Sequence, residues 1–415
     1  MTAAENPERF FINRDFFLYW CIRICSMMGF QMLAVAVGWQ VYELTHSAMA
    51  LGLVGLAGFV PAVFLVLVVG QVADRFDRRR VVQASHALEA TVAITLAVGS
   101  WQGWMTRDGI FACVFFLGVG KAFSSPALAA LLPSLVSPLQ LSRAISSSSA
   151  AMQTAIILGP AVGGLLYVAG AVAVYAVAGA LFLLAIILLG SIRRPAKAAV
   201  VVATKAEDRS IFAGIRFIRQ QPVVLGAISL DLFAVLLGGA TALLPIFAKD
   251  ILHAGPVGLG MLRSAPAVGA LLMSFWLARH PIERHAGKIM FGGVAMFGLA
   301  TIVFGLSQSF LLSLGMLAIL GASDMISVVV RSSLIQLETP DAMRGRVSAV
   351  NFLFIGASNQ LGEFESGVTA AWFGTEPAVV LGGIGTVIVT ALWMYWFPPL
   401  LKRDKLVESR DSKAA

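Results

Sequence analysis

The chain has 415 residues, of which 58% are hydrophobic and 13% are charged, and its mean hydropathy is +0.86. A soluble protein of this length cannot bury so much apolar surface in its core, so the composition excludes a soluble protein and indicates one embedded in a membrane. The formal net charge of +8 does not indicate nucleic-acid binding, because the Lys and Arg side chains lie in short segments between long apolar runs.

Twelve apolar segments follow one another along the chain, each close to the length of about 20 residues with which a helix crosses a bilayer. We therefore predict an all-α integral membrane protein with twelve transmembrane helices. The predicted spans are residues 15–44, 51–73, 81–103, 109–132, 142–168, 171–192, 222–248, 257–279, 288–306, 310–336, 347–372 and 376–398.

The charges between the spans predict how the chain is oriented. Most of the 30 Lys and Arg lie in the N-terminal segment, in the loops after the even-numbered spans and in the tail, whereas the opposite loops carry Arg107 and Lys249 only. Because positively charged loops stay on the cytoplasmic side, both termini are predicted to be cytoplasmic. The residues up to Asn13 lack the architecture of a cleavable signal, so the first span is expected to remain.

A polar stretch at residues 193–221 divides six spans from six and predicts two halves of similar size. Within it, residues 211–218 are predicted to form an amphipathic helix on the cytoplasmic face. The predicted domains are an N-terminal six-helix half at residues 1–192, a cytoplasmic linker at 193–221, a C-terminal six-helix half at 222–400 and a cytoplasmic tail at 401–415.

Weak internal similarity suggests that the two halves arose by duplication. Gly118 and Lys121 in the fourth span correspond to Gly321 and Asp324 in the tenth, and both segments then run to a proline and a basic residue. The similarity predicts equivalent positions near the middle of the membrane for Lys121 and Asp324. Two six-helix halves around a central site are a known transporter architecture.

The loop between the second and third spans combines a glycine, an acid and several arginines at fixed spacing. A carboxylate at the cytoplasmic end of a helix can accept hydrogen bonds from the N-terminus of a neighbouring helix. The arginines also have a simpler interpretation, in which their positive charge only orients the loop. The residues of this motif are Gly70, Asp74, Arg75, Arg78 and Arg79.

The fifth span carries a second motif, formed by Gly159, Pro160, Gly163 and Gly164. The glycines allow another helix to approach closely, and the proline removes a main-chain hydrogen bond and kinks the helix. We expect this span to lie at an interface between helices that slides or seals during function.

The two motifs resemble motif A and motif C of the major facilitator superfamily, in the branch that includes the enterobactin exporter. Asp77 stands where motif A usually has a glycine, and Ala155 replaces the leading glycine of motif C. The resemblance implies the major facilitator fold and transport by alternating access in a bacterial cytoplasmic (inner) membrane. Motif C marks the antiporters of the superfamily, which favours efflux.

The resemblance also implies roles for the residues of the first motif. Asp74 would bind the start of span 11, at residues 346–350, and so latch the cytoplasmic side shut. Arg78 and Arg79 would bind nearby carbonyls, acids or lipid phosphates.

Ionisable side chains inside the spans are costly to bury and are therefore functional candidates. A proton-coupled exporter needs a carboxylate that binds and releases a proton near neutral pH. Asp231 and Asp324 are the leading candidates, and Glu363 and Glu365 come second because they lie nearer the outer mouth. The full set of candidates for proton coupling or substrate binding is Asp231, Asp324, Arg331, Arg23, Lys121, Glu363 and Glu365.

A structural role for these charges is the alternative. Asp231 would then pair with Arg23, and Asp324 would pair with Lys121 or Arg331. Fixed pairs of this kind would hold helices together without carrying protons.

No residue pattern indicates an enzyme. The five histidines lie near span ends or in loops, and Cys21, Cys25 and Cys113 lie in spans without further metal ligands nearby. The segment that ends in Gly120 and Lys121 lacks the first glycine and the hydroxyl residue of a nucleotide-binding loop. We therefore expect no metal, no cofactor and no ATP hydrolysis, and an ion or substrate gradient as the energy source.

These observations predict a proton-driven exporter of a siderophore-like or amphiphilic drug-like small molecule. Its expected partners are that substrate, protons and the lipid bilayer, with no nucleic acid and no second copy of the chain. An uptake facilitator or symporter is the alternative within transport. A membrane sensor or assembly protein that does not transport is the alternative of another class, although a scaffold has no need of the gate motifs and buried charges.

Overall fold

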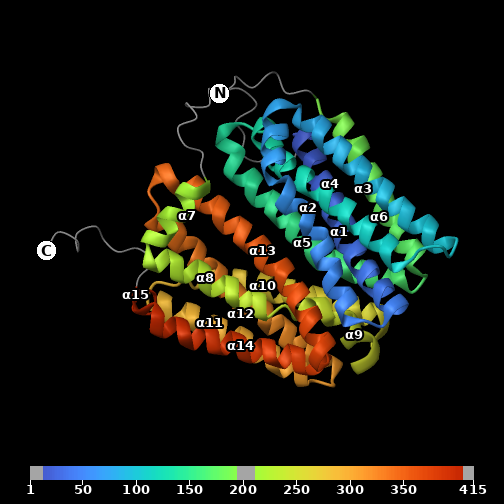
Figure 1. The fold of residues 1–415 in the computed structure, drawn as a ribbon. Helices are drawn as coiled ribbons and strands as arrows, with labels where there is room; N and C mark the ends of the chain where they lie inside the picture. Colours follow the sequence, from blue (N-terminus) through green and yellow to red (C-terminus); the bar gives the residue numbers. More distant parts are fainter. Residues whose placement is uncertain (1–12, 194–210, 405–415) are drawn as a thin grey trace. The chain divides into compact units, whose positions relative to one another are not determined.

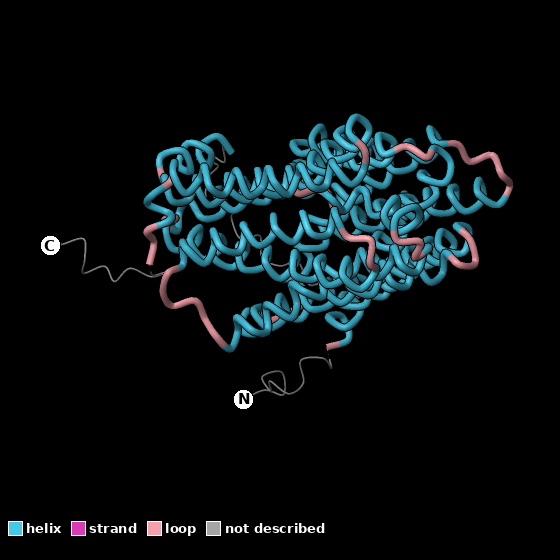
Figure 2. The backbone as a smooth tube through the Cα atoms, turned by 90° about the horizontal axis from the view of Figure 1, so that it is seen from below, coloured by secondary structure: helices cyan, strands magenta, loops and turns pink. Residues whose placement is uncertain are grey.

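The computed structural model describes residues 13–193 and 211–404, and within these ranges the chain forms helices and loops without any strand (Figure 1, Figure 2). Eleven helical segments of the described residues are long and apolar enough to cross a membrane, which confirms the predicted all-α membrane fold. The remaining predicted span, residues 347–372, lies within α13, a helix of 33 residues that is not one of these eleven.

The long helices follow the predicted spans closely. The helices of the first half are α1 (Arg14–Thr45), α2 (Ala48–Arg75), α3 (Arg78–Trp101), α4 (Arg107–Leu131), α5 (Leu141–Tyr167) and α6 (Ala171–Ser191). Those of the second half are α8 (Pro222–Leu237), α10 (Gly255–Arg279), α11 (Ala286–Leu306), α12 (Phe310–Glu338), α13 (Asp341–Phe373) and α14 (Thr375–Trp396). The short elements η2 (Leu132–Ser134), η3 (Pro138–Gln140) and α15 (Pro398–Leu401) lie between or after them.

The seventh predicted span is long and apolar enough to cross a membrane, but it is not one continuous helix. After α8 the chain continues through η4 (Ala240–Leu243), α9 (Leu244–Ile246) and the π-helical η5 (Phe247–Ile251). Gly238 and Gly239 stand at the break, and consecutive glycines weaken a helix because they lose the most backbone freedom when it forms. Pro245 adds a second interruption because it has no main-chain N–H to donate.

The same packing pattern recurs in the two halves. In the first half α1 packs on α4, α5 and α6, α3 packs on α4 and α6, and α5 packs on α6. In the second half α8 packs on α12, α13 and α14, α11 packs on α12 and α14, and α13 packs on α14. Helix by helix these are the same pairs, so the tertiary contacts repeat the duplication that the sequence predicted.

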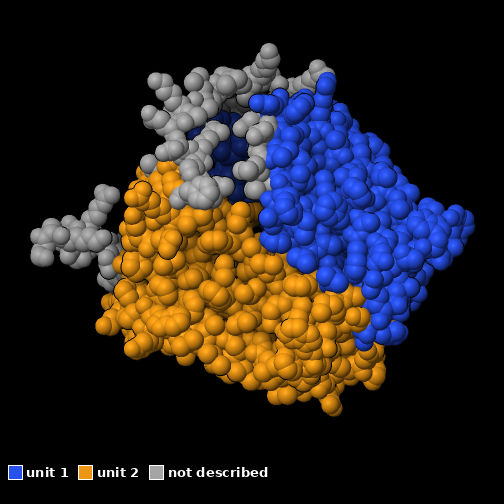
Figure 3. Space-filling model, in the orientation of Figure 1, with its two compact units in different colours: residues 1–46, 53–202, 254–264 blue, residues 47–52, 203–253, 265–415 orange. Residues whose placement is uncertain are grey.

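The chain divides into two compact units (Figure 3). Unit 1 consists of Met1–His46, Leu53–Val202 and Ala254–Ser264, and unit 2 consists of Ser47–Gly52, Ala203–His253 and Ala265–Ala415. The first turns of α2 thus belong to unit 2, and the first turns of α10 belong to unit 1. Unit 1 buries Phe16, Tyr19 and Ile22 of α1 in its core, and unit 2 buries Met290 and Phe291 of α11 in its own.

A close helix crossing occurs at corresponding positions in the two units. In unit 1 a methyl group at Gly118 of α4 would collide with the main chain of Gly58 on α2. In unit 2 a methyl group at Gly321 of α12 would collide with the main chain of Pro266 on α10. Because Gly118 and Gly321 are the residues that the internal similarity paired, glycine is required at the same place in both halves for the same packing reason.

The amphipathic helix predicted at residues 211–218 is present as α7 (Ile211–Gln220). Its Ile218 is buried with Val347 and Val350 of α13, and Gly214 lies against the main-chain carbonyl of Arg346. The apolar face of α7 therefore packs on the first turns of α13. Its place on the cytoplasmic face stays a prediction.

Candidate functional site

A buried ion pair joins α8 and α12 in unit 2. Asp231 on α8 pairs with Arg331 on α12, and their side chains are 6% and 3% exposed. A small cavity beside the pair holds about the space of one water molecule. Its lining consists of Asp231, Ala234, Val235, Val294, Phe297, Ser323, Asp324 and Ser327.

Asp324 reaches this cavity because it precedes Arg331 by seven residues, or two turns, on the same face of α12. Two carboxylates therefore share the site with one guanidinium group, and Asp324 has no ion pair with any described residue. The hydroxyl of Ser327 and the Nε of Arg331 are buried and lack a hydrogen-bond partner among the described residues. The site is thus rich in polar groups that are not fully satisfied.

This arrangement corrects the pairs offered as the structural alternative. Arg331 was one of two expected partners of Asp324, and Asp231 was expected to pair with Arg23. The partner of Arg331 is instead Asp231, because α8 packs against α12 and brings the two side chains together.

The basic candidates of unit 1 occupy different surroundings. The Nη2 of Arg23 on α1 lies 3.4 Å from the sulfur of Met152 on α5, and its buried Nε has no described partner. The ammonium group of Lys121 on α4 lies 5.7 Å from the ring centre of Phe30, a cation–π contact. Each therefore contacts an apolar or polarisable group rather than an acid.

The two candidate acids of α13, Glu363 and Glu365, are both partly buried. Glu365 accepts a hydrogen bond of 2.8 Å from the hydroxyl of Thr369, one turn further along. Glu363 lies on a different side of the helix from Glu365, since residues two apart do not share a helix face. Neither lines the cavity beside Asp231.

The arginines of the loop between α2 and α3 bind helix ends within unit 1. Arg78 donates to the carbonyl of Ala130 at 2.9 Å, in the last turn of α4, and Arg79 donates to Leu189 at 2.8 Å, in the last turn of α6. Cations are favourable at helix C-termini, where carbonyls lack helical partners. Carbonyls were among the expected partners of these two arginines, and these contacts confirm that expectation.

Other residues of this motif have simpler surroundings. Asp77, which stands where the superfamily has a glycine, caps α3 by accepting from the main-chain N–H of Arg79 at 2.9 Å. Arg75 ends α2 and is exposed. The surroundings of Gly70 and the side chain of Asp74 lie outside the described part of the structure, so the latch stays a prediction.

The glycines of the fifth span face two different helices in unit 1. A methyl group at Gly159 would collide with Gln31 on α1, and one at Gly163 would crowd Met32 there. A methyl group at Gly164 would instead collide with the Pro256 carbonyl on α10.

The contact of α5 with α10 is reciprocal. A methyl group at Gly260 of α10 would meet the carbonyl of Pro160, and the hydroxyl of Ser264 lies 2.6 Å from the carbonyl oxygen of Ile157. Pro160 and Gly164 of the motif therefore both lie at this contact, where the two main chains approach without intervening side chains.

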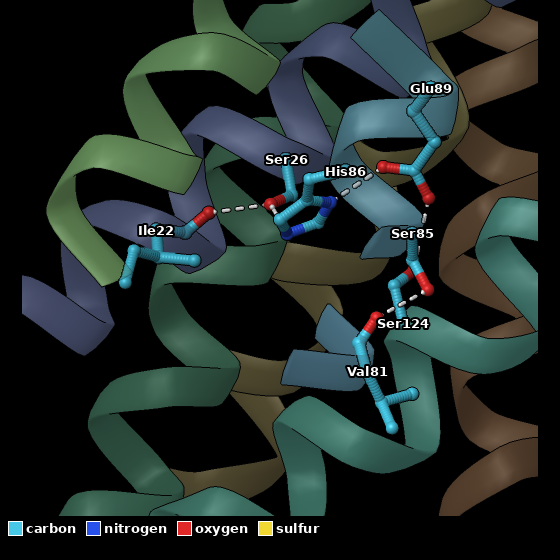
Figure 4. A network of polar contacts seen from close by, with 7 residues as sticks. All are labelled: Ile22, Ser26, Val81, Ser85, His86, Glu89 and Ser124. Atoms are coloured by element: carbon cyan, nitrogen blue, oxygen red, sulfur yellow. Dashed lines mark hydrogen bonds and ion pairs between the residues drawn. The ribbon is translucent and has the colours of Figure 1, made fainter. Parts of the chain in front are cut away.

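Sequence reasoning missed a buried polar cluster in unit 1 (Figure 4). His86 and Glu89 on α3 are fully buried, and they meet through Nδ1 and Oε2 at 2.6 Å. Ser26 on α1 lies 3.0 Å from His86 Nε2, and Ser124 on α4 donates to Glu89 at 3.2 Å. The expectation that the histidines lie at span ends or in loops is wrong for His86. The missed signal was Glu89, the one acid in the third predicted span.

A second missed acid is Glu43, near the end of α1. It accepts hydrogen bonds from the indole N–H of Trp39 at 2.6 Å and from the hydroxyl of Tyr167 at 3.0 Å. Tyr167 ends α5, so this acid ties the last turns of α1 and α5 together.

The repeated helix packing, the glycine contacts of α5 and the buried charges define a multi-pass membrane transporter rather than an enzyme. The sequence profile of the transmembrane secretion effector family matches residues 10–412, so the chain belongs to this family of the major facilitator superfamily.

Similar proteins include two kinds of bacterial exporter. Macrolide efflux protein A of Streptococcus pyogenes is 24% identical over 381 residues, covering 89% of this chain and 92% of that protein. The enterobactin exporter EntS of Citrobacter koseri is 27% identical over 379 residues, covering 90% of this chain and 89% of that protein.

Solved structures share the fold. A bacterial homologue of the human lysosomal transporter Spinster superimposes with a TM-score of 0.79 at 14% identity, over 98% of this chain and all of that one. A bacterial homologue of the iron transporter ferroportin gives a TM-score of 0.73 at 16% identity, over 92% and 98%.

Proposed function

We propose that the protein exports a small molecule across the membrane in exchange for protons, by alternating access. The buried group of Asp231, Asp324 and Arg331 is the observation that carries this proposal. It holds one more acid than base, and an exporter driven by protons needs a buried acid of this kind.

The charges define two states of the site. With both acids ionised the three groups carry one net negative charge, and with one proton on Asp324 they carry none. An unbalanced charge is costly in an apolar interior, so the proton-free state is stable only while water or substrate reaches the cavity. Access from alternating sides would therefore bind a proton from one side and release it to the other.

The substrate class rests on the relatives, whose names record macrolide efflux and enterobactin export. We propose an amphiphilic substrate of drug-like or siderophore-like chemistry.

The remaining parts of the proposal follow from the sequence. The protein works as a monomer in a bacterial cytoplasmic membrane, with both termini in the cytoplasm. Its six-helix halves are residues 1–192 and 222–400, and Asp74 latches the cytoplasmic side.

The test uses purified protein in liposomes that contain a pH-sensitive dye and are given macrolides and catechol siderophores. We expect substrate-dependent proton movement that Asp324→Asn abolishes. Asp108→Asn is the matched control, because Asp108 is an exposed acid at the start of α4 whose side chain is 77% exposed.

Three outcomes separate the alternatives. Proton movement that survives Asp324→Asn would transfer the carrier role to Asp231 or to the acids of α13. Substrate movement without protons would indicate a facilitator, and substrate entering together with protons would indicate uptake by symport.

A further inference from the structure

The buried cluster around His86 has no part in the acid site of unit 2, and its hydrogen atoms can be counted. The hydroxyl of Ser26 has one proton, and it donates that proton to the carbonyl of Ile22 at 2.8 Å (Figure 4). The Ser26 oxygen lies 3.0 Å from Nε2 of His86, and with its own proton engaged it accepts a hydrogen bond from Nε2. In this arrangement Nε2 carries a proton.

The other ring nitrogen is constrained in turn. Nδ1 of His86 lies 2.6 Å from Oε2 of Glu89, so one proton must lie between these two atoms. Without it, two lone pairs would face each other at that distance. The pair is then either imidazolium with carboxylate or neutral imidazole with carboxylic acid, and in both forms its net charge is zero.

A second arrangement fits the same heavy atoms with one proton fewer. If Nε2 loses its proton, the Ser26 hydroxyl can turn from the Ile22 carbonyl and donate to Nε2. The shared proton then resides on Nδ1 and is donated to ionised Glu89, so the pair carries one negative charge. Every hydrogen bond to the ring survives, because a hydroxyl is both a donor and an acceptor.

From these two arrangements we propose that His86 and Glu89 form a proton-binding site in unit 1, with the hydroxyl of Ser26 turning as the proton binds or leaves. The site binds a single proton and needs no movement of a helix. It is distinct from the acids beside Arg331.

The groups around His86 and Glu89 can accommodate the pair both when it is neutral and when it carries one negative charge. Ser124 donates to the second oxygen of Glu89, and Lys121 on the same helix acts on Glu89 electrostatically. The nearest charge on α1 is Arg23, one turn before Ser26, and α6 presents the ring of Phe182, 6.1 Å from His86, and no charged side chain. Lys121 can therefore offset the negative charge left when the proton departs.

The space for the acid is provided by a glycine on α4. A methyl group at Gly120 would meet the Cγ and Oε1 atoms of Glu89 at 2.7 and 2.9 Å. The carboxyl group is thus held in a niche between helices, which fixes its distance from the ring.

The test is a pH titration of the full-length protein in lipid nanodiscs, labelled with nitrogen-15 in its histidine rings and followed by NMR. The His86 signals are assigned by their loss in His86→Gln. As the pH rises, we expect Nε2 of His86 to change from protonated to unprotonated while Nδ1 keeps its proton. His280→Gln, which replaces an exposed histidine, should leave this transition unchanged.

Two variants test the parts of the site. Glu89→Gln keeps the shape of the side chain, but glutamine cannot share a proton with His86. The change in protonation of Nε2 should therefore be lost. Ser26→Ala should lower the midpoint of this change by up to about one pH unit, because the hydroxyl donates to the Ile22 carbonyl only in the protonated arrangement. His86 signals that stay constant with pH in the wild type would overturn the proposal, as would a transition unchanged in both variants.

Any role of this site in transport rests on the proposed function. In the liposome assay Glu89→Gln should lower the number of protons moved for each substrate molecule. If the wild type moves no protons, the proposed function fails while the NMR titration still decides whether the site binds one. If Glu89→Gln instead moves as many protons for each substrate molecule as the wild type, while the wild type shows the expected NMR transition, the site binds a proton without taking part in proton-coupled transport.

Discussion

At the scale of single residues, Asp231 and Arg331 depend on each other. Both side chains lie between α8 and α12 with less than a tenth of their surface exposed. A buried pair of this kind adds little stability by itself, because removing the two charges from water costs about as much as their attraction returns. Removing only one partner is different, since it leaves an uncompensated buried charge.

The first prediction concerns this asymmetry. Asp231→Asn should lower the free energy of unfolding by about 3–5 kcal/mol, because it leaves Arg331 without its counter-ion. The double variant Asp231→Asn/Arg331→Met should recover most of that loss. Unfolding in detergent can be followed with a thiol-reactive dye, because Cys21, Cys25 and Cys113 are free cysteines within helices.

The matched control is Asp324→Asn, which removes an acid from the same cavity without breaking an ion pair. It should change the stability by less than about 1 kcal/mol. If the single and double variants of the pair were equally unstable, the pairing of Asp231 with Arg331 would not explain the loss.

At the scale of elements, α5 is the helix whose sequence is most specialised for contact. Gly159 and Gly163 allow α1 to approach closely, and Gly164 allows the same for the first turns of α10. Pro160 lies beside Gly260 of α10, where the missing side chain lets the main chains approach. One motif thus serves two interfaces within unit 1.

The second prediction tests the contact with α10. Gly164→Leu should separate the two helices at a cost of about 1–3 kcal/mol, the usual penalty for overfilling a packed interface. If transport requires this contact, the rate should fall about tenfold or more, while membrane insertion persists. The liposome assay measures the rate, and the amount of protein in the membrane fraction measures insertion.

The control is Gly315→Leu on α12, because a Cβ atom added at Gly315 has no neighbouring atom within 4 Å. It should leave the rate unchanged. A normal rate in Gly164→Leu would mean that transport does not depend on close approach of α5 and α10.

At the scale of the whole molecule, alternating access requires the cytoplasmic side to close and open. The third prediction is that Asp74→Asn impairs transport and leaves insertion largely intact, because the neutral amide loses the negative charge that is favourable beside the positive end of a helix. The rate in liposomes and the membrane fraction provide the two measurements. Asp77→Asn is the control, since asparagine also caps a helix well.

Full activity of Asp74→Asn would remove the latch assignment. Equal losses in Asp74→Asn and Asp77→Asn would indicate instead that the loop needs negative charge in general.

The fourth prediction concerns the orientation of the chain. In a variant without the native cysteines, Asp108→Cys should react with a membrane-impermeant maleimide in intact cells, whereas Glu283→Cys should react only after permeabilisation. Both positions are exposed, but they lie in loops after an odd and an even predicted span. The reverse pattern would place the termini outside the cytoplasm.

Several particular elements could be predicted from the sequence. The ends of α6 and α11 lie within two residues of their predicted spans, because the change from apolar to polar residues is a local signal. α13 begins at Asp341, earlier than predicted, because a helix can continue beyond its apolar segment into a charged one. The break after α8 was missed, although Gly238 and Gly239 were visible in the sequence.

The sequence by itself determined the membrane-spanning architecture, the family motifs and the acids worth considering, because transfer into a bilayer depends on runs of about 20 neighbouring residues. Only the tertiary structure decided that Arg331 pairs with Asp231, that Gly164 faces α10, and that His86 and Glu89 meet Ser26. A helix fixes the face on which a side chain lies, but its partner comes from a helix far away in the sequence. Which faces meet is decided by packing over the whole unit.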